Sequence, residues 1–264
     1  MSIVLALAVL GALPGAAPPP ARAEVDPRRV EISYTFLGRD LFLYGQAEAG
    51  TRRVLAVMEG PPVASVRLLE KGRVALFWLG VRQYRLDGVP GVYLVNVSCP
   101  SCRGLAACRH GGVLDECNRL LSPEGIVVGP EGIASRARVS SLSGPLRSGE
   151  AQRVVQGFWA LQTARKLYGT GTNAIRLNTQ GAFYHTFSLP ASAPDGRYRV
   201  TTYFLGDDRL LGVESNDVFV RKTGTVEWLS RLADRRPFAY GALTVLIAVA
   251  AGWITGTLFK RGGH

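Results

Sequence analysis

Apolar residues are concentrated at the two ends of the chain. Ile3 to Leu13 is an apolar run of 11 residues, and a Pro/Ala-rich stretch follows it as far as Ala23. A run of this length before small residues is typical of a cleaved secretory signal, because a membrane span needs about 20 residues. We therefore expect a signal peptide at residues 1–23, removed after Ala23.

The second apolar segment, Phe238 to Phe259, contains 22 residues without a charge. As a helix rising about 1.5 Å per residue it would cover roughly 33 Å, the thickness of the hydrocarbon core. Pro237 stands where the helix would begin, and the basic pair Lys260-Arg261 follows it. The pattern predicts a single transmembrane helix at residues 237–259 and a short cytoplasmic tail at residues 260–264.

Small residues recur along this predicted span. Ala248, Gly252 and Gly256 are spaced four residues apart, which places them near one face of a helix and allows a second helix to approach closely. They are candidate helix-packing residues, for self-association or for packing on another integral membrane protein. The alternative is that Gly and Ala are simply frequent in membrane helices.

Between the two ends, apolar and polar residues alternate with the period of β-strands. Val30, Ile32, Tyr34 and Phe36 alternate with polar neighbours, and short apolar segments separated by Gly and Pro follow. We expect a mainly β fold, an immunoglobulin-like sandwich whose first half or first domain is residues 24–98. The further strands are predicted at Arg39–Ala47, Arg53–Met58, Val66–Lys71, Val74–Leu79 and Val92–Val97, with Trp78 and Tyr93 in the core.

A helical period replaces the alternation at residues 150–169. Ser148 is a candidate N-cap and Gly169 a candidate C-terminal stop. This amphipathic helix is expected to pack on the core, which we favour over a groove for a partner. The apolar stripe consists of Val154, Phe158, Leu161 and Tyr168.

Strands resume at residues 170–224. Phe183 to Leu189 and Tyr198 to Phe204 alternate, Pro194 to Gly196 forms a turn between them, and Val213–Arg221 gives another strand. These strands could complete the first sandwich or form a second small domain, and we favour a second small domain. His185 is expected to be a buried neutral imidazole. A juxtamembrane helix is expected at residues 225–236.

All four cysteines lie within residues 99–149, a Gly/Pro/Ser/Arg-rich segment that we interpret as a long loop. They are Cys99, Cys102, Cys108 and Cys117, and His110 lies among them. Two disulfides are the favoured interpretation, because an oxidising compartment permits them and they would order the loop. A metal site of these cysteines or of three with His110 is an alternative, as is a redox pair at Cys99 and Cys102.

Composition and charge narrow the function. With 47% hydrophobic and 19% charged residues the chain is neither disordered nor a coiled coil. The predicted signal peptide and the flanks of the predicted span contain Arg22, Arg235, Arg236, Lys260 and Arg261. Without these five residues the body has a net charge of +6, and its sequence contains no nucleic-acid-binding motif. The sequence has no Gly-x-Ser-x-Gly, P-loop, His-Glu-x-x-His or dinucleotide fingerprint, so we expect no enzyme, no cofactor and no nucleic-acid partner.

Short motifs spread over nearly all of the mature chain resemble a family of putative transmembrane proteins described mainly from alphaproteobacteria. These motifs are Phe36-Leu37-Gly38, Leu43-Tyr44-Gly45, Glu59-Gly60-Pro61, Arg73-Val74 with Trp78, Val89-Pro90-Gly91-Val92-Tyr93, Leu167-Tyr168, Leu189-Pro190, Gly196-x-Tyr198, Ala251-Gly252-Trp253 and Phe259-Lys260-Arg261. The cysteine segment departs from the family pattern, in which a shorter connection poor in cysteine is expected.

The resemblance implies a single-pass protein of the bacterial inner membrane, with a β-rich body in the periplasm and the C-terminus in the cytoplasm. It also implies an accessory role beside a transporter-type membrane partner, and membrane lipid as a further contact. The leading hypothesis is therefore a non-enzymatic accessory or binding subunit. The alternative is a periplasmic redox or metal-handling protein that uses the four cysteines.

Overall fold

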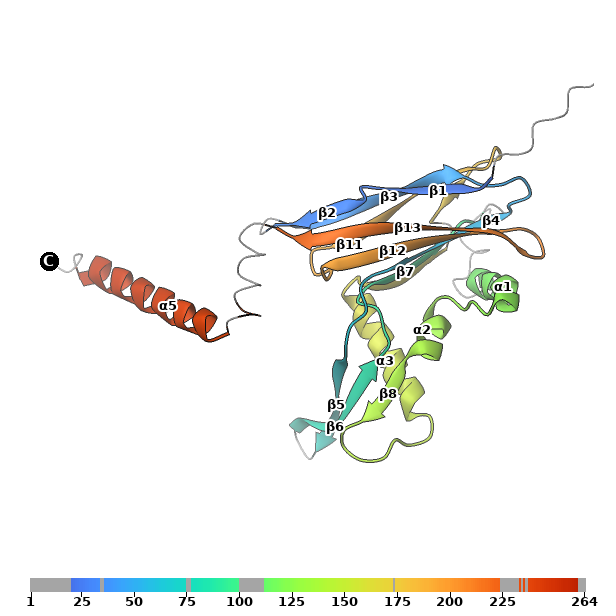
Figure 1. Ribbon diagram of the computed structural model, residues 1–264. Coiled ribbons are helices and arrows are strands. Elements are labelled where there is room, and N and C mark those ends of the chain that lie inside the picture. The colour runs from blue at the N-terminus through green and yellow to red at the C-terminus, as the bar shows by residue number, and fades with distance from the viewer. Residues whose placement is uncertain are drawn as a thin grey trace, which may run out of the picture.

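The computed structural model describes residues 20–33, 36–74, 77–99, 112–172, 174–223 and 237–260, with positions 233 and 235. The predicted juxtamembrane helix at 225–236 lies almost entirely outside these residues, as does most of the signal peptide. The fold is mainly β, as expected, with two large sheets, one small sheet and several helices (Figure 1).

The first large sheet has four antiparallel strands in the order β1-β3-β11-β10. Its strands are β1 (Arg22–Asp26), β3 (Gly38–Gln46), β10 (Arg176–Leu177) and β11 (Ala182–Pro190). Since β1 begins at Arg22, cleavage after Ala23 would shorten it by two residues. Gly45 of β3 lies between β1 and β11, and a Cβ there would collide with the Arg22 carbonyl and the Phe183 ring.

The second large sheet has six strands in the order β2-β13-β12-β4-β7-β9, and two of its pairs, β2 with β13 and β7 with β9, are parallel. The strands are β2 (Arg29–Ile32), β4 (Arg53–Glu59), β7 (Tyr93–Val97), β9 (Tyr168–Thr172), β12 (Gly196–Leu205) and β13 (Leu210–Lys222). This arrangement differs from the seven antiparallel strands of an immunoglobulin constant domain, so the immunoglobulin-like expectation was too specific.

The two large sheets form one sandwich. The strands predicted at residues 170–224 complete it, which is the first of the two predicted alternatives, and they do not form the second small domain that we favoured. Strands from both halves of the chain pair directly, β3 with β11 and β4 with β12. The rings of Phe183 and Phe204, one from each sheet, meet edge-on at 5.7 Å between centroids. The alternation predicted for β11 and β12 is confirmed, since Phe187, Leu189, Tyr198 and Val200 are buried.

A smaller three-stranded sheet projects from the sandwich and consists of the hairpin β5 (Val66–Val74) and β6 (Phe77–Asp87), extended by β8 (Arg138–Ser141) (Figure 1). The sequence assigned its two hairpin strands to the sandwich, because alternation specifies a strand but not its sheet. Helix α3 (Glu150–Ala164) packs beside this small sheet and contacts β8 and β9. We call these four elements the hairpin module.

The segment predicted as a cysteine-containing loop at residues 99–149 holds regular structure. It contains α1 (Gly112–Leu121), the 3-10 turn η1 (Ser122–Glu124), α2 (Pro130–Arg136) and β8. Val113, Cys117 and Leu121 are buried at four-residue spacing along α1. That spacing is a short helical stripe, and the sequence analysis missed it because Cys117 was considered only for its chemistry.

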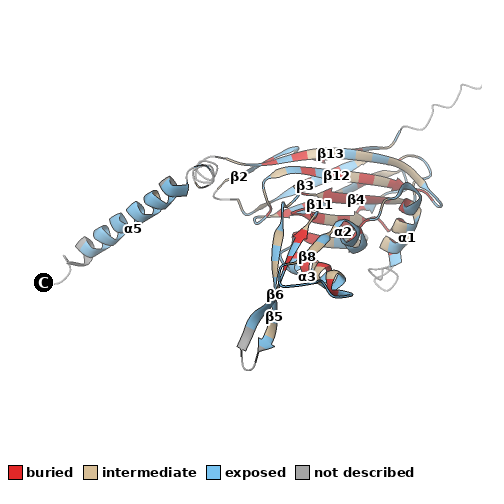
Figure 2. Ribbon diagram, turned by 60° about the horizontal axis from the view of Figure 1, so that its bottom comes forward, coloured by how far each residue is buried: buried red, intermediate tan, exposed pale blue. Residues whose placement is uncertain are grey.

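The last element is α5 (Pro237–Lys260), which confirms the predicted helix at 237–259. Its described side chains are exposed almost throughout, and it lies apart from the sheets (Figure 2). Counted over the residues that the structure describes, no helix reaches the length and hydropathy needed to cross a membrane.

Candidate functional site

The cysteines were the main candidate site, and the structure corrects the expectation of two disulfides. Cys117 is a free thiol with no exposed surface. Burial raises the pKa of the Cys117 thiol to about 11, although the charge of Arg53 lowers it in part. The group is therefore protonated near neutral pH, and a protonated thiol is a poor nucleophile.

The other predicted ligands are only partly visible. Cys99 is buried just beyond the end of β7, whereas Cys102, Cys108 and His110 lie outside the described residues. Within the described part of the chain, no group of three His, Cys, Asp or Glu side chains could hold a metal ion. Cys99 is disulfide-bonded, and its partner lies outside the described residues. One disulfide of the predicted cysteine segment is therefore present, and its pairing with Cys102 or Cys108 stays a prediction, whereas a metal site that needs the Cys99 thiolate is not consistent with this bond.

His185 occupies the position expected of it, on the inward face of β11. Its Nδ1 lies 3.0 Å from the carbonyl oxygen of Ala174, so Nδ1 carries the hydrogen in this bond. The imidazole packs edge-on against the ring of Phe187 at 4.6 Å between centroids. Burial lowers the pKa of His185, which favours the neutral ring, and the prediction of a neutral core histidine is confirmed.

The predicted helix-packing residues Ala248, Gly252 and Gly256 all lie on α5 and are exposed. A Cβ added at Gly252 or Gly256 would meet no atom within 4 Å. Their surface is thus open to a second helix, but no partner chain contributes to the structure, and their packing role stays a prediction.

Helix α3 forms part of a site that the sequence did not predict. The ends and the buried face of this helix differ from the predicted ones. The helix begins after Gly149 and ends at Ala164, so neither Ser148 nor Gly169 caps it. The chain reverses at Lys166, whose φ of 59° is left-handed. The buried face consists of Glu150, Val155, Phe158 and Gln162, displaced by about one residue from the predicted stripe.

Aromatic rings fix α3 to the edge of the six-stranded sheet. Phe158 and Trp159 of the helix meet the ring of Tyr168 at centroid distances of 5.5 and 5.2 Å, and Trp159 also meets Tyr93. The hydroxyl of Tyr168 donates a 2.6 Å hydrogen bond to the carbonyl oxygen of Pro90. The helix is therefore anchored on one side, and its other side faces the β5–β6 hairpin.

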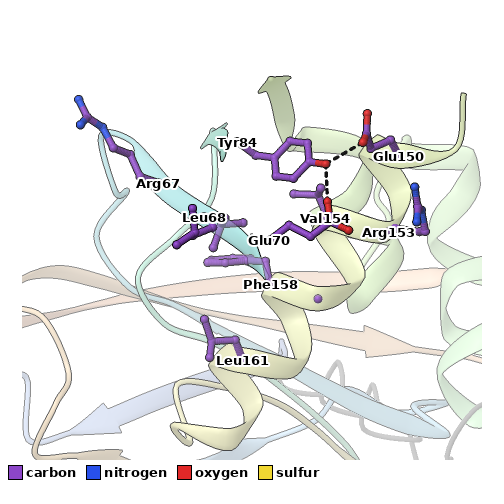
Figure 3. A pocket seen from close by; sticks show the side chains of 11 residues that line it. Arg67, Leu68, Glu70, Tyr84, Glu150, Arg153, Val154, Phe158 and Leu161 are labelled. Carbon is purple, nitrogen blue, oxygen red and sulfur yellow. Dashed lines mark hydrogen bonds between the residues drawn. The ribbon is translucent and has the colours of Figure 1, made fainter. Parts of the chain in front are cut away.

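A pocket of about 430 Å³ lies between α3 and β5, within the range of small-molecule sites. Its apolar wall includes three members of the predicted helical stripe and Leu68 of β5 (Figure 3). These residues are Leu68, Val154, Phe158 and Leu161, of which Leu161 is 44% exposed. Phe158 of this stripe is buried against Tyr168, as predicted, whereas Val154 and Leu161 border open space.

The polar end of the pocket is built around Tyr84 on β6. Its hydroxyl lies 2.7 Å from a carboxylate oxygen of Glu70 and 2.7 Å from one of Glu150 (Figure 3). Glu150 also pairs with Arg82 at 2.7 Å and accepts a hydrogen bond of 2.8 Å from the backbone N–H of Arg147. We call Glu70, Tyr84 and Glu150 the polar triad.

The members of the polar triad differ in electrostatics. The Arg147 N–H, then the Tyr84 hydroxyl and the Arg82 charge hold the pKa of Glu150 below its usual value. Burial, together with hydrogen bonds to both carboxylates, raises the pKa of Tyr84 far above its usual value, so the phenol stays a neutral donor. Among the described residues Glu70 takes part in no ion pair, and its only hydrogen bond comes from Tyr84.

The arrangement can bind and orient a ligand. Its two carboxylates are held by one phenol and an arginine, and no serine, threonine or cysteine side chain lines the pocket as a nucleophile. Nothing in the sequence pattern could have found it, since it depends on pairing Glu70 and Tyr84 with a residue 66 positions beyond Tyr84.

Comparisons with known proteins give a family and no function. The profile of a family described as "Putative transmembrane protein" (Alph_Pro_TM) matches residues 22–261. No curated protein matches the chain. No solved structure matches it either. The matched region includes the sandwich, the hairpin module and α5, and it confirms the resemblance derived from the short motifs. The chain therefore belongs to this family of putative transmembrane proteins.

Proposed function

We propose that this chain is a membrane-anchored, non-enzymatic binding protein. Its sandwich and hairpin module form an extracytoplasmic body, and α5 holds that body at the bacterial inner membrane with the C-terminus in the cytoplasm. Through α5 it acts as an accessory subunit of another integral membrane protein, for which a transporter is the expected class.

The exposed apolar surface of α5 is the observation that carries the proposal. Phe238 is 93% exposed, Trp253 75% and Val249 67%. A helix that is apolar all round needs a cover of lipid or protein, because soluble proteins rarely expose such a surface. Gly256 is the last residue of α5 whose exposure is described, and the uncharged run of the sequence continues to Phe259.

Three further observations support the proposal. The family whose profile matches residues 22–261 is named for transmembrane proteins. The small residues Ala248, Gly252 and Gly256 leave one side of α5 open for the close approach of a second helix. The absence of catalytic motifs in the sequence supports a role in binding.

The test is chemical cross-linking in membranes followed by purification of the full-length chain. Gly252→Leu with Gly256→Leu should remove the cross-linked band of a partner or of a second copy, since leucines would keep the helices apart. Ala239→Leu with Ala250→Leu places both leucines on the opposite face of α5 and is the matched control, which should keep the band. Equal cross-linking of both double variants would refute a packing role for this face.

A further inference from the structure

The pocket between α3 and the hairpin has a feature that packing does not explain. Gly157 lies in the interior of α3, and a Cβ added there would meet no atom within 4 Å. A glycine weakens a helix interior relative to alanine. Here it leaves open space between Val154 and Leu161, on the apolar wall of the pocket.

The charges around the pocket identify the kind of group that fits its polar end. A hydroxyl has one hydrogen, so Tyr84 cannot donate to Glu70 and Glu150 at the same moment. Glu150 has two other donors, Arg82 and the backbone of Arg147. Glu70 has no other donor and no ion pair among the described residues, although Arg82 lies opposite it on β6, so its carboxylate keeps the capacity to accept a hydrogen bond from a ligand.

Two arginines also line the pocket, and their placement argues against an anionic ligand. Arg67 and Arg153 are exposed, as is Glu70, but the guanidinium of Arg67 points away from Tyr84 and Glu150 (Figure 3). An exposed, extended arginine loses side-chain entropy when it turns toward a ligand. Glu70 loses less, because its hydrogen bond to Tyr84 already orients it.

We propose that this pocket binds a small organic amine. Its ammonium group pairs with the carboxylate of Glu70, and its apolar body lies over Gly157 between Leu68, Val154 and Phe158. The volume of about 430 Å³ accommodates an aromatic ring with a short alkyl chain. The inference goes beyond the proposed function and does not depend on it, because the pocket lies wholly within the hairpin module.

The experiment compares three probes of one shape and different charge. These are 4-phenylbutylamine, 4-phenylbutanol and 4-phenylbutanoate, titrated into the full-length chain in a non-ionic detergent and followed by calorimetry. We expect the amine to bind about fivefold or more tightly than the alcohol, as one partly exposed charge pair of about 1 kcal/mol would give, and the acid to bind more weakly than either.

Three variants separate the contribution of the Glu70 charge from that of the open space at Gly157. Glu70→Gln keeps the shape of the side chain and should remove the preference for the amine without weakening the binding of the alcohol. Gly157→Leu fills the space and should abolish binding of both, while the melting temperature stays equal or rises because leucine favours a helix. Gly157→Ala, a smaller filling, should weaken binding to an intermediate degree.

Clear outcomes would overturn the proposal. One is equal binding of the amine to the wild type and to both Gly157 variants, which would place the amine elsewhere or in the detergent. Another is an unchanged preference for the amine in Glu70→Gln. Tighter binding of 4-phenylbutanoate than of the amine would assign the pocket to an anion held by the arginines.

Discussion

The sandwich and the hairpin module are made of similar side chains but differ in how completely these fill space. Between the two large sheets Leu41, Val200 and Phe204 have no exposed surface, as expected of a close-packed core. In the hairpin module the half-buried Val154 and the exposed Leu161 line an open pocket beside the buried Phe158, and the inner end of that pocket is polar. The sandwich is therefore the scaffold, and the module is the part with room for a ligand.

The largest expected effect is the loss of stability when a buried ring is removed from the core of the sandwich. Phe204→Ala should lower the free energy of unfolding by about 3–5 kcal/mol, because it removes a fully buried ring that packs on Phe183. Leu161→Ala in the pocket wall should cost less than about 1 kcal/mol, since Leu161 is 44% exposed. Urea denaturation followed by near-UV circular dichroism measures both. Equal losses would remove the distinction between the two regions.

Replacing a glycine by alanine should change the free energy of unfolding in opposite directions in the two regions. Gly45→Ala should destabilise by about 2 kcal/mol or more, since the new Cβ would collide with the backbone carbonyl of Arg22. Gly157→Ala should stabilise by about 0.5–1 kcal/mol, because it meets no atom within 4 Å and favours the helix. The melting temperatures of the two variants measure both changes. A loss of stability in Gly157→Ala would contradict open space at that position.

Cys117 provides a test of the filled region outside the two sheets. Cys117→Ser should cost about 1–2 kcal/mol, because it places a hydroxyl in the apolar site beneath α1. The native thiol should resist alkylation at pH 7.5, since it is buried and its pKa is raised to about 11. Mass spectrometry after iodoacetamide treatment, with and without denaturant, measures this. Rapid alkylation of the native chain at Cys117 would count against burial.

The smallest effect is a pH dependence confined to the module. The pKa of Glu150 is lowered in the folded chain from an ordinary value of 4.5. The contribution of Glu150 is therefore present above about pH 4.5 and is lost as pH falls through the lower folded value. Glu150→Gln should be less stable than the wild type at pH 7 by a difference that shrinks in acid. A difference that stays constant from pH 7 to pH 3 would be the contrary result.

The sequence predicted much of the sandwich, because strict alternation identifies a strand with one buried face. Strands β3, β4, β11 and β12 lie within one or two residues of their predicted positions. Alternation does not say which strands pair, and so it could not join β4 to β12, more than a hundred residues apart. It also assigned the β5–β6 hairpin to the wrong sheet.

The candidate sites were harder to predict. Clustering in the sequence drew attention to the cysteines, yet burial gives Cys117 the role of a core residue. The pocket depends on a hydrogen bond from Tyr84 to Glu150 and on the space beside Gly157, and neither leaves a periodic signal. Only the stripe of Val154, Phe158 and Leu161 indicated that this side of the helix was apolar.

Extraction of native membranes with alkaline carbonate tests most directly the claim that α5 anchors the body. The full-length chain should remain in the membrane pellet at pH 11. A variant with Leu246→Asp and Val249→Asp should move to the supernatant, because carboxylates at the centre of a span are strongly unfavourable. Release of the wild-type chain by carbonate would contradict the account.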